Sequence, residues 1–180
     1  MYLLQSLLAL LLLTLAVSTS VPTPLTRDAT AVINDFRTLS TDLSALVKSV
    51  ATYNGELFPA LDIQMKEAAV ERDLEQATRD TTAATPFTMS ESAITTRALL
   101  GLEPDLRTAL GTLVQKKPLV DQIKLGPVVR MALVSLKSKT ESFLAALQDK
   151  STAVDRTALV TKMREFNVVF ESAIKAYTYL

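Results

Sequence analysis

Apolar residues recur through most of this chain at spacings of three and four, which is the period of an amphipathic α-helix. The clearest stripe covers about three heptads and predicts a first long helix. Its members are Val32, Phe36, Leu39, Leu43, Leu46, Val50 and Tyr53. Thr26 is placed to cap the start of this helix. Asn54-Gly55 is placed to end it, because both residue types accept the left-handed backbone of a C-cap.

A second helix is predicted from near Pro59 toward Ala84, since proline suits the first turn of a helix. Its apolar face is narrow and rich in alanine, and charged residues occupy most of its other positions. The apolar members are Leu61, Met65, Ala68, Val70, Leu74, Ala77 and Ala84. We interpret this segment as an outer helix with a solvated face and a thin inner stripe.

A third helix is predicted after Pro86, where Thr88 and Glu91 match the spacing of a capping box. Its apolar face contains Ile94, Leu99, Leu102, Leu106, Leu110, Leu113 and Val114. Pro104 lies inside this helix and predicts a kink, because proline removes one backbone hydrogen bond and clashes one turn back. Lys116-Lys117-Pro118 is expected to end it.

Two more helices follow a short helical turn at Leu119–Leu125. Gly126-Pro127 breaks the register and restarts it, with proline again in the first turn. The fourth long helix has Val129, Leu133, Leu136, Thr140, Phe143 and Leu147 on one face. After a loop around residues 149–152, the fifth repeats the pattern with Leu159, Met163, Phe166, Phe170, Ala173, Tyr177 and Leu180.

No strand pattern competes with these helices, and each helix has only about three heptads. Short breaks between helices favour antiparallel neighbours in one bundle over an extended coiled coil. We therefore predict an all-α, single-domain antiparallel bundle of about five long helices, kinked near Pro104 and Gly126-Pro127. Bent helices and inner positions that mix bulky groups with Ala and Thr leave room for a central apolar cavity.

The N-terminal segment has a different character. Residues 1–26 contain no charged side chain, and an apolar run from Leu7 to Val17 precedes small residues and two prolines. This order is typical of a secretory signal peptide. We predict a signal over residues 1–20, a helical domain over 21–180, and a secreted, extracellular protein. The alternative is an uncleaved anchor helix, because no Lys or Arg precedes the apolar run.

The composition narrows the chemistry that the chain can perform. It has no His and no Cys, so nucleophile–base pairs of the Ser–His or Cys–His type are excluded. Its 19 basic and 19 acidic residues cancel, which removes the electrostatic basis for binding nucleic acid. Carboxylate pairs such as Glu71 and Glu75 have basic neighbours and are interpreted as solvated. We expect a binding protein rather than an enzyme, with no cofactor and no metal site.

Four segments of this chain carry a resemblance to a known family. They are Tyr53-Asn54-Gly55, the restart Leu125–Val129, the segment Leu133–Leu147 and the ending Phe166–Tyr177. Together they resemble the hydrophobic surface binding protein A family of secreted fungal proteins, over roughly residues 25–180. The resemblance implies a five-helix bundle with a long apolar cavity. It also implies adsorption to hydrophobic surfaces and carriage of long-chain fatty acids or similar lipids.

The same resemblance implies partners and a location. The partners are hydrophobic surfaces or long-chain lipids, together with a secreted esterase-type enzyme that would be recruited to a hydrophobic solid. Related proteins are cell-wall mannoproteins, so association with a cell wall is a further expectation. The alternative is a structural cell-wall mannoprotein or antigen without a ligand, which predicts a dry, filled core.

The candidate ligand-binding residues are apolar positions on the inner faces of the predicted helices. They are Phe36, Leu39, Leu43, Met65, Leu99, Leu102, Leu113, Val129, Leu133, Leu136, Phe143, Met163, Phe166 and Phe170. Candidate contacts for a carboxylate head group lie close to the helix breaks. They are Arg97, Lys116, Lys124 and Arg130. For each apolar residue the alternative is ordinary core packing, and for each basic residue it is an exposed solubilising charge.

Overall fold

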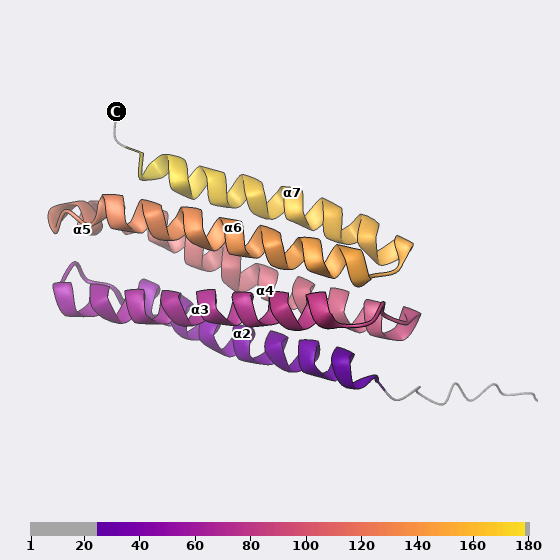
Figure 1. Cartoon of the computed structure of the whole chain (residues 1–180). Coiled ribbons are helices and arrows are strands. Elements are labelled where there is room, and N and C mark those ends of the chain that lie inside the picture. Colours follow the sequence, from indigo (N-terminus) through magenta and orange to yellow (C-terminus); the bar gives the residue numbers. More distant parts are fainter. Residues whose placement is uncertain (1–24, 179–180) are drawn as a thin grey trace, which may run out of the picture.

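The computed structural model describes residues 25–178, and every regular element in that range is an α-helix. The helices are α2 (Arg27–Thr52), α3 (Leu57–Ala83), α4 (Met89–Gln115), α5 (Lys117–Gln122), α6 (Gly126–Lys150) and α7 (Ala153–Ala176). Five of them are long, and consecutive long helices run in opposite directions (Figure 1). The predicted all-α bundle is confirmed, with the short α5 as a sixth helix. The predicted signal peptide lies outside the described residues.

The five long helices pack as a closed ring. Helix α2 contacts α3 and α4, α3 also contacts α6, α6 contacts α7, and α7 contacts α4. Each long helix therefore has two main neighbours, and the ring surrounds a shared interior. Five helices of about 10 Å diameter enclose a wider centre than four do, so their side chains must reach further to fill it.

Local sequence signals account for the ends of these helices. The Thr26 side chain caps α2 by accepting a 3.2 Å hydrogen bond from the Ala29 N–H, and Thr88 with Glu91 forms the predicted capping box of α4. Gly55 adopts the left-handed backbone (φ 95°) in the connection from α2 to α3. Helix α4 continues through Pro104 as one helix, and the kink expected there stays a prediction.

Glu91 joins the starts of two helices. Its carboxylate accepts hydrogen bonds from the backbone N–H groups of Thr26 (2.6 Å) and Thr88 (2.9 Å), and from the Thr88 hydroxyl. Burial by itself would raise the pKa of Glu91, but these hydrogen bonds lower it to about 2. Glu91, a member of the α4 capping box, therefore also holds the N-terminal end of α2.

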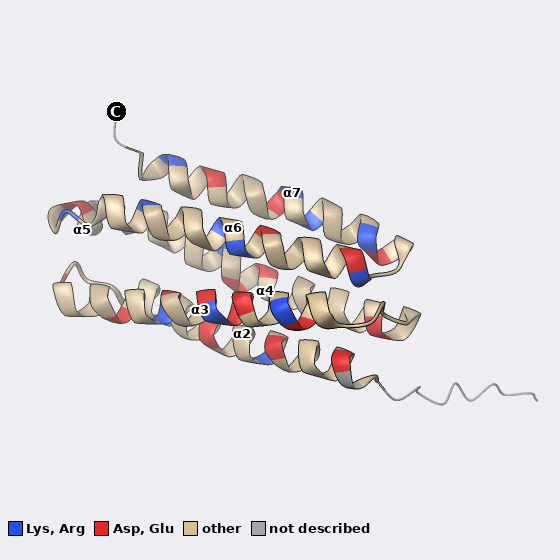
Figure 2. Cartoon of the chain, viewed as in Figure 1, with Lys and Arg blue, Asp and Glu red and all other residues tan. Residues whose placement is uncertain are grey.

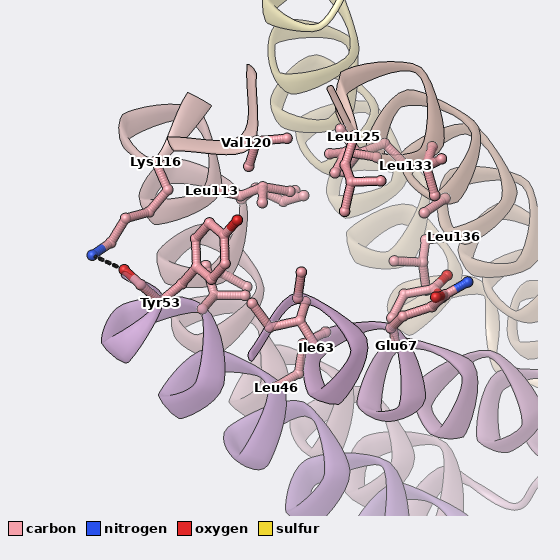
Figure 3. Close-up of a pocket in the computed structure, with 18 of the residues that line it drawn as sticks. Leu46, Tyr53, Ile63, Glu67, Leu113, Lys116, Val120, Leu125, Leu133 and Leu136 are labelled. Carbon is pink, nitrogen blue, oxygen red and sulfur yellow. Dashed lines mark hydrogen bonds between the residues drawn. The ribbon is translucent and has the colours of Figure 1, made fainter. Parts of the chain in front are cut away.

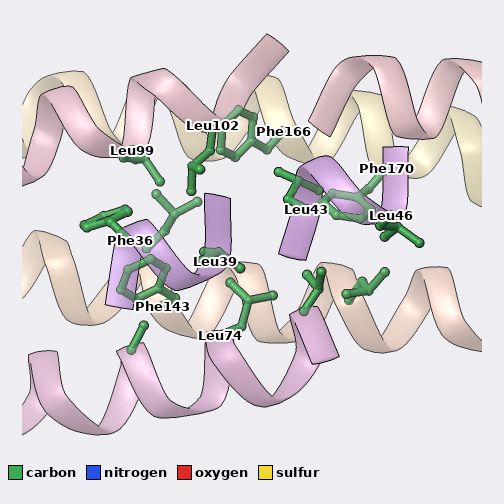
Figure 4. Close-up of a cluster of buried hydrophobic side chains, with 14 of the residues drawn as sticks. Phe36, Leu39, Leu43, Leu46, Leu74, Leu99, Leu102, Phe143, Phe166 and Phe170 are labelled. Atoms are coloured by element: carbon green, nitrogen blue, oxygen red, sulfur yellow. The ribbon is translucent and has the colours of Figure 1, made fainter. Parts of the chain in front are cut away.

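One half of the bundle is tightly filled with apolar side chains. Phe36 and Phe143 lie with their ring centroids 5.2 Å apart. Leu74, Leu99 and Phe166 are buried in the same cluster (Figure 4). This cluster brings together side chains from all five long helices, and it holds the ring together at the end opposite α5.

Charged residues of both signs are spread over the long helices, and several lie together near the middle of α3 (Figure 2). Lys139 of α6 pairs with Glu71 (3.4 Å) and Glu75 of α3. Lys162 of α7 pairs with Glu103 of α4 at 2.8 Å. Within residues 25–178, none of the helices is both long and apolar enough to span a bilayer.

Candidate functional site

The half of the ring next to α5 contains an apolar cavity of about 290 Å³ (Figure 3). This volume is close to the lower end of the range of about 300–1,000 Å³ that is usual for small-molecule sites. Helices α2, α3, α4 and α6 form its walls, α5 contributes Val120, and α7 contributes Phe170. Most of the lining side chains are aliphatic, so the site suits a hydrocarbon rather than a polar ligand.

Small residues explain why this half of the ring is not filled. Ala60, Ala109 and Ala132 line the cavity on three different helices, at positions where a larger side chain would occupy the space. Leu113, Leu125 and Leu133 are bulky but lie around the cavity rather than across it (Figure 3). The loop after α5 sets the restart of α6, and Lys124 there adopts a positive φ of 58°.

The cavity reaches solvent between α3 and α6. Its lining residues Leu57, Leu61 and Val128 are exposed, and all three belong to these two helices. Further exposed apolar side chains lie on the same helices, including Phe58, which is 83% exposed, and Met131, which is 63% exposed. We call these five residues the apolar rim. Exposed apolar side chains of this kind mark a surface suited to contact with apolar partners.

A basic and a phenolic group mark the end of the cavity nearest α5. The Nζ of Lys116 donates a 2.8 Å hydrogen bond to the backbone carbonyl of Tyr53, and both residues line the cavity. Tyr53 is 3% exposed, and its hydroxyl is buried without a hydrogen-bond partner. Burial raises the pKa of Tyr53 above its usual value, so the hydroxyl stays protonated near neutral pH.

An acidic group marks the opposite end of the cavity. Glu67 of α3 lies near Leu136 of α6 (Figure 3), and Thr140 lines the same region. Burial, reinforced by the neighbouring Glu71 carboxylate, raises the pKa of Glu67 to about 7, although Lys139 acts in the opposite direction. The two ends of the cavity therefore differ in charge, because Lys116 lies at one and Glu67 at the other.

The structure places six of the predicted apolar residues on the cavity wall. These are Leu43, Leu113, Val129, Leu133, Leu136 and Phe170. Six others pack away from it, in the filled half of the bundle. These are Phe36, Leu39, Leu99, Leu102, Phe143 and Phe166. Periodicity identified the inner faces, but it could not show which part of each face borders empty space.

The two predicted methionines also lie away from the cavity. Met65 is 66% exposed, because the inner face of α3 follows Ile63, Glu67 and Val70, with Leu61 at its exposed edge. Met163 packs as a half-buried residue against the core, and its sulfur lies 3.9 Å from the Gln148 amide nitrogen.

Of the four basic residues considered for a head group, Lys116 alone lines the cavity. Arg97, Lys124 and Arg130 are exposed and are not part of its wall. Tyr53 was predicted as a member of the first apolar stripe, but its hydroxyl gave no sequence signal of a binding role. Ala60 and Glu67 were also missed, because small and polar residues on a cavity wall show no clear apolar periodicity, and Ile63 was missed because it lies off the predicted apolar line of α3.

Across residues 25–178, no set of three or more acidic, His or Cys side chains is arranged to hold a metal ion. The polar groups on the cavity wall are few, and Lys116 and Glu67 lie far apart along it. The cavity therefore offers a ligand an apolar wall, with the basic Lys116 and the Tyr53 hydroxyl at one end.

Comparison with known proteins agrees with this geometry. The family model of hydrophobic surface binding protein A matches residues 29–149. The chain is similar to AfMP4p, whose crystal structure is a complex with palmitic acid, with a TM-score of 0.82 and 36% identity over 83% of this chain and 99% of that one. A search of the curated proteins finds no significant match.

Two further structures share the fold at low identity. They are ligand-binding domains 1 and 2 of the Penicillium marneffei MP1 protein, both complexed with arachidonic acids. Each has a TM-score of 0.80 and 13% identity, covering 85% and 87% of this chain and 100% of each domain. The family model and the structural likeness lead to the same conclusion: this chain belongs to the hydrophobic surface binding protein A family.

Proposed function

We propose that this chain is a secreted, non-catalytic protein that carries one long-chain fatty acid in the cavity. The observation that carries the proposal is the apolar cavity itself, whose wall is built by four helices and opens between α3 and α6. The likeness to the palmitic acid complex of AfMP4p, at 36% identity, supports the same ligand class.

The size of the site and the driving force are compatible with such a ligand. The cavity wall extends along α6 from Leu125 to Thr140, which is about 22 Å at ~1.5 Å per residue. Burying about sixteen methylenes gives on the order of 13 kcal/mol before costs. Association and ordering consume several kcal/mol or more, which leaves affinity in the micromolar to nanomolar range. Chain-length selectivity should be weak, since one methylene changes little.

The apolar rim supports a second, connected role in adsorption to hydrophobic surfaces. Three of its residues line the cavity and all five are exposed on α3 and α6, so adsorption through them would bring the cavity toward the surface. A lipid could then pass from the surface to the cavity without crossing water. Recruitment of a secreted esterase-type enzyme to such a surface, and association with a cell wall, are further proposals that rest on family membership.

The test is a displacement titration of the delipidated protein, using a fluorescent fatty acid and palmitate as competitor. Ala109→Phe should fill the cavity and weaken palmitate binding by about tenfold or more. Ala145→Phe, at an exposed position of α6, is the matched control and should bind like the wild type. Absence of saturable binding by the wild type would overturn the carrier proposal and leave the ligand-free structural protein as the better explanation.

A further inference from the structure

Tyr53 has a buried hydroxyl that the folded chain leaves without a hydrogen-bond partner. The residue is 97% buried, as its 3% exposure shows, and it lines the cavity. Figure 3 shows its hydroxyl directed into the cavity, toward Leu113 and Val120, which offer it only hydrocarbon side chains. Buried polar groups are nearly always satisfied, and each exception calls for an explanation.

The other buried tyrosine shows that the fold can satisfy such a group. Tyr177, also fully buried, donates a 2.7 Å hydrogen bond from its hydroxyl to the backbone carbonyl of Leu113. Tyr177 does not line the cavity. The unsatisfied phenol is therefore the one that faces the cavity, and an unpaired donor in an apolar cavity is a preformed contact for a ligand acceptor.

Charge selects the kind of acceptor that suits this end of the cavity. Lys116 lies at the same end of the cavity as Tyr53. Its ammonium donates a 2.8 Å hydrogen bond to the Tyr53 backbone carbonyl. The acidic Glu67 lies at the opposite end (Figure 3). A carboxylate placed near Tyr53 meets a hydroxyl donor at the end of the cavity that carries the positive charge of Lys116, whereas near Glu67 it meets a second carboxyl group.

We propose that the Tyr53 hydroxyl, at the same end of the cavity as Lys116, is the head-group anchor that binds the carboxylate of the fatty acid. This inference rests on the proposed carrier function and adds a fixed ligand direction. The carboxylate lies at the end near α5, with the Tyr53 O–H donating to one of its oxygens. The acyl chain extends along α6 toward Leu136 and Phe170.

The test compares Tyr53→Phe with Tyr177→Phe in the full delipidated protein. Each substitution removes one hydroxyl from a buried ring. We expect Tyr53→Phe to weaken palmitate binding by about tenfold, as loss of a hydrogen bond to a charged group does, and to change binding of methyl palmitate by about twofold at most. Tyr177→Phe should leave the affinity for both ligands close to that of the wild type.

A second readout reports on the carboxylate directly. In the complex with palmitate labelled with ¹³C at its carboxyl carbon, NMR titration should give a lower carboxyl pKa in the wild type than in Tyr53→Phe, because the lost hydrogen bond favoured the charged form. Thermal unfolding of ligand-free Tyr53→Phe should occur at or above the wild-type temperature, which shows that the variant is folded.

The outcomes separate the two proposals. If the wild type binds palmitate, and Tyr53→Phe binds it with the same affinity and the same carboxyl pKa, the head-group assignment is overturned. The carrier function stays intact in that case. Equal weakening by Tyr53→Phe and Tyr177→Phe would also overturn it, since the effect would then follow general packing. No palmitate binding by the wild type would overturn both proposals.

Discussion

The Nζ of Lys116 donates a 2.8 Å hydrogen bond to the backbone carbonyl of Tyr53, which joins the C-terminal ends of α4 and α2 at one end of the cavity. The bond satisfies a carbonyl that has no partner within its own helix. Since Lys116 is half-buried and lines the cavity, it has both a structural and a proposed ligand role.

Lys116→Met should therefore affect stability and binding together. Methionine keeps most of the apolar stem but loses the ammonium, so we expect a loss of about 1 kcal/mol in the free energy of unfolding. We also expect palmitate binding to weaken severalfold. Lys124→Met, at an exposed residue outside the cavity, is the control. Urea unfolding and palmitate titration of both variants check this, and equal behaviour of the two variants would contradict it.

The two buried tyrosines should respond to loss of the hydroxyl with opposite sign. Tyr177→Phe breaks the 2.7 Å bond to Leu113 and leaves a carbonyl unsatisfied, which should cost about 1 kcal/mol or more in the ligand-free protein. Tyr53→Phe removes a hydroxyl that has no partner, so it should be neutral or stabilising. Urea unfolding of delipidated samples measures both, and equal destabilisation would show that Tyr53 has a partner after all.

Glu91 should make the bundle sensitive to acid. Its folded-state pKa is lowered to about 2 by hydrogen bonds that outweigh its burial, below the ordinary value of 4.5. Its contribution is therefore fully present above about pH 4.5 and is lost as the pH falls toward 2. The shift corresponds to roughly 3 kcal/mol. In Glu91→Gln, unfolding followed between pH 7 and pH 2.5 should show a lower stability at neutral pH and a smaller loss on acidification.

The carboxylates between α2 and α3 should act in the opposite direction. Burial, followed by the nearby Asp80 and Asp73, raises the pKa of Asp35 to about 6. A raised folded-state pKa favours the folded chain below the usual pKa of 3.8, and this advantage is lost as the pH rises through 6. Asp35→Asn should raise stability by about 1 kcal/mol at pH 8 after allowance for partial exposure. At pH 4 it should have little effect, so an equal gain at both pH values would refute this origin.

The apolar rim should control adsorption separately from ligand binding. Phe58→Ser combined with Met131→Ser removes the two most exposed side chains of the rim and should reduce retention on hydrophobic beads. Its palmitate affinity in solution should remain close to wild type. Val154→Ser with Val168→Ser, at exposed positions of α7, is the matched control. Equal loss of retention in both double variants would show that adsorption has no preferred face.

The bundle could be predicted from local signals, whereas the shape of its interior could not. The apolar stripe from Val32 to Tyr53 and the Thr88–Glu91 capping box depend on residues close in sequence, and the structure confirms both. The cavity depends on residues far apart in sequence, such as Ala60, Ala109 and Ala132, which together leave a space. No single helix pattern contains that information, so periodicity predicted core and cavity residues as one set.

The polar end of the cavity was equally hidden. Tyr53 follows Val50 at the spacing of an ordinary core residue, and nothing in that spacing shows that its hydroxyl faces an apolar space. The basic residues near the helix breaks looked equivalent in sequence, yet Lys116 borders the cavity and Lys124 is exposed. Lys116 lies at the turn into α5, whereas Lys124 lies in the loop after α5, where its backbone has a positive φ of 58°.

Native mass spectrometry of the delipidated protein, titrated with palmitate, tests the carrier function most directly. We expect the mass to increase by one palmitate in a saturable manner in the wild type and in Ala145→Phe, and this adduct to be largely lost in Ala109→Phe. An unchanged bare mass in the wild type at all palmitate concentrations, or an adduct that Ala109→Phe retains in full, would contradict a fatty acid bound inside the helical ring.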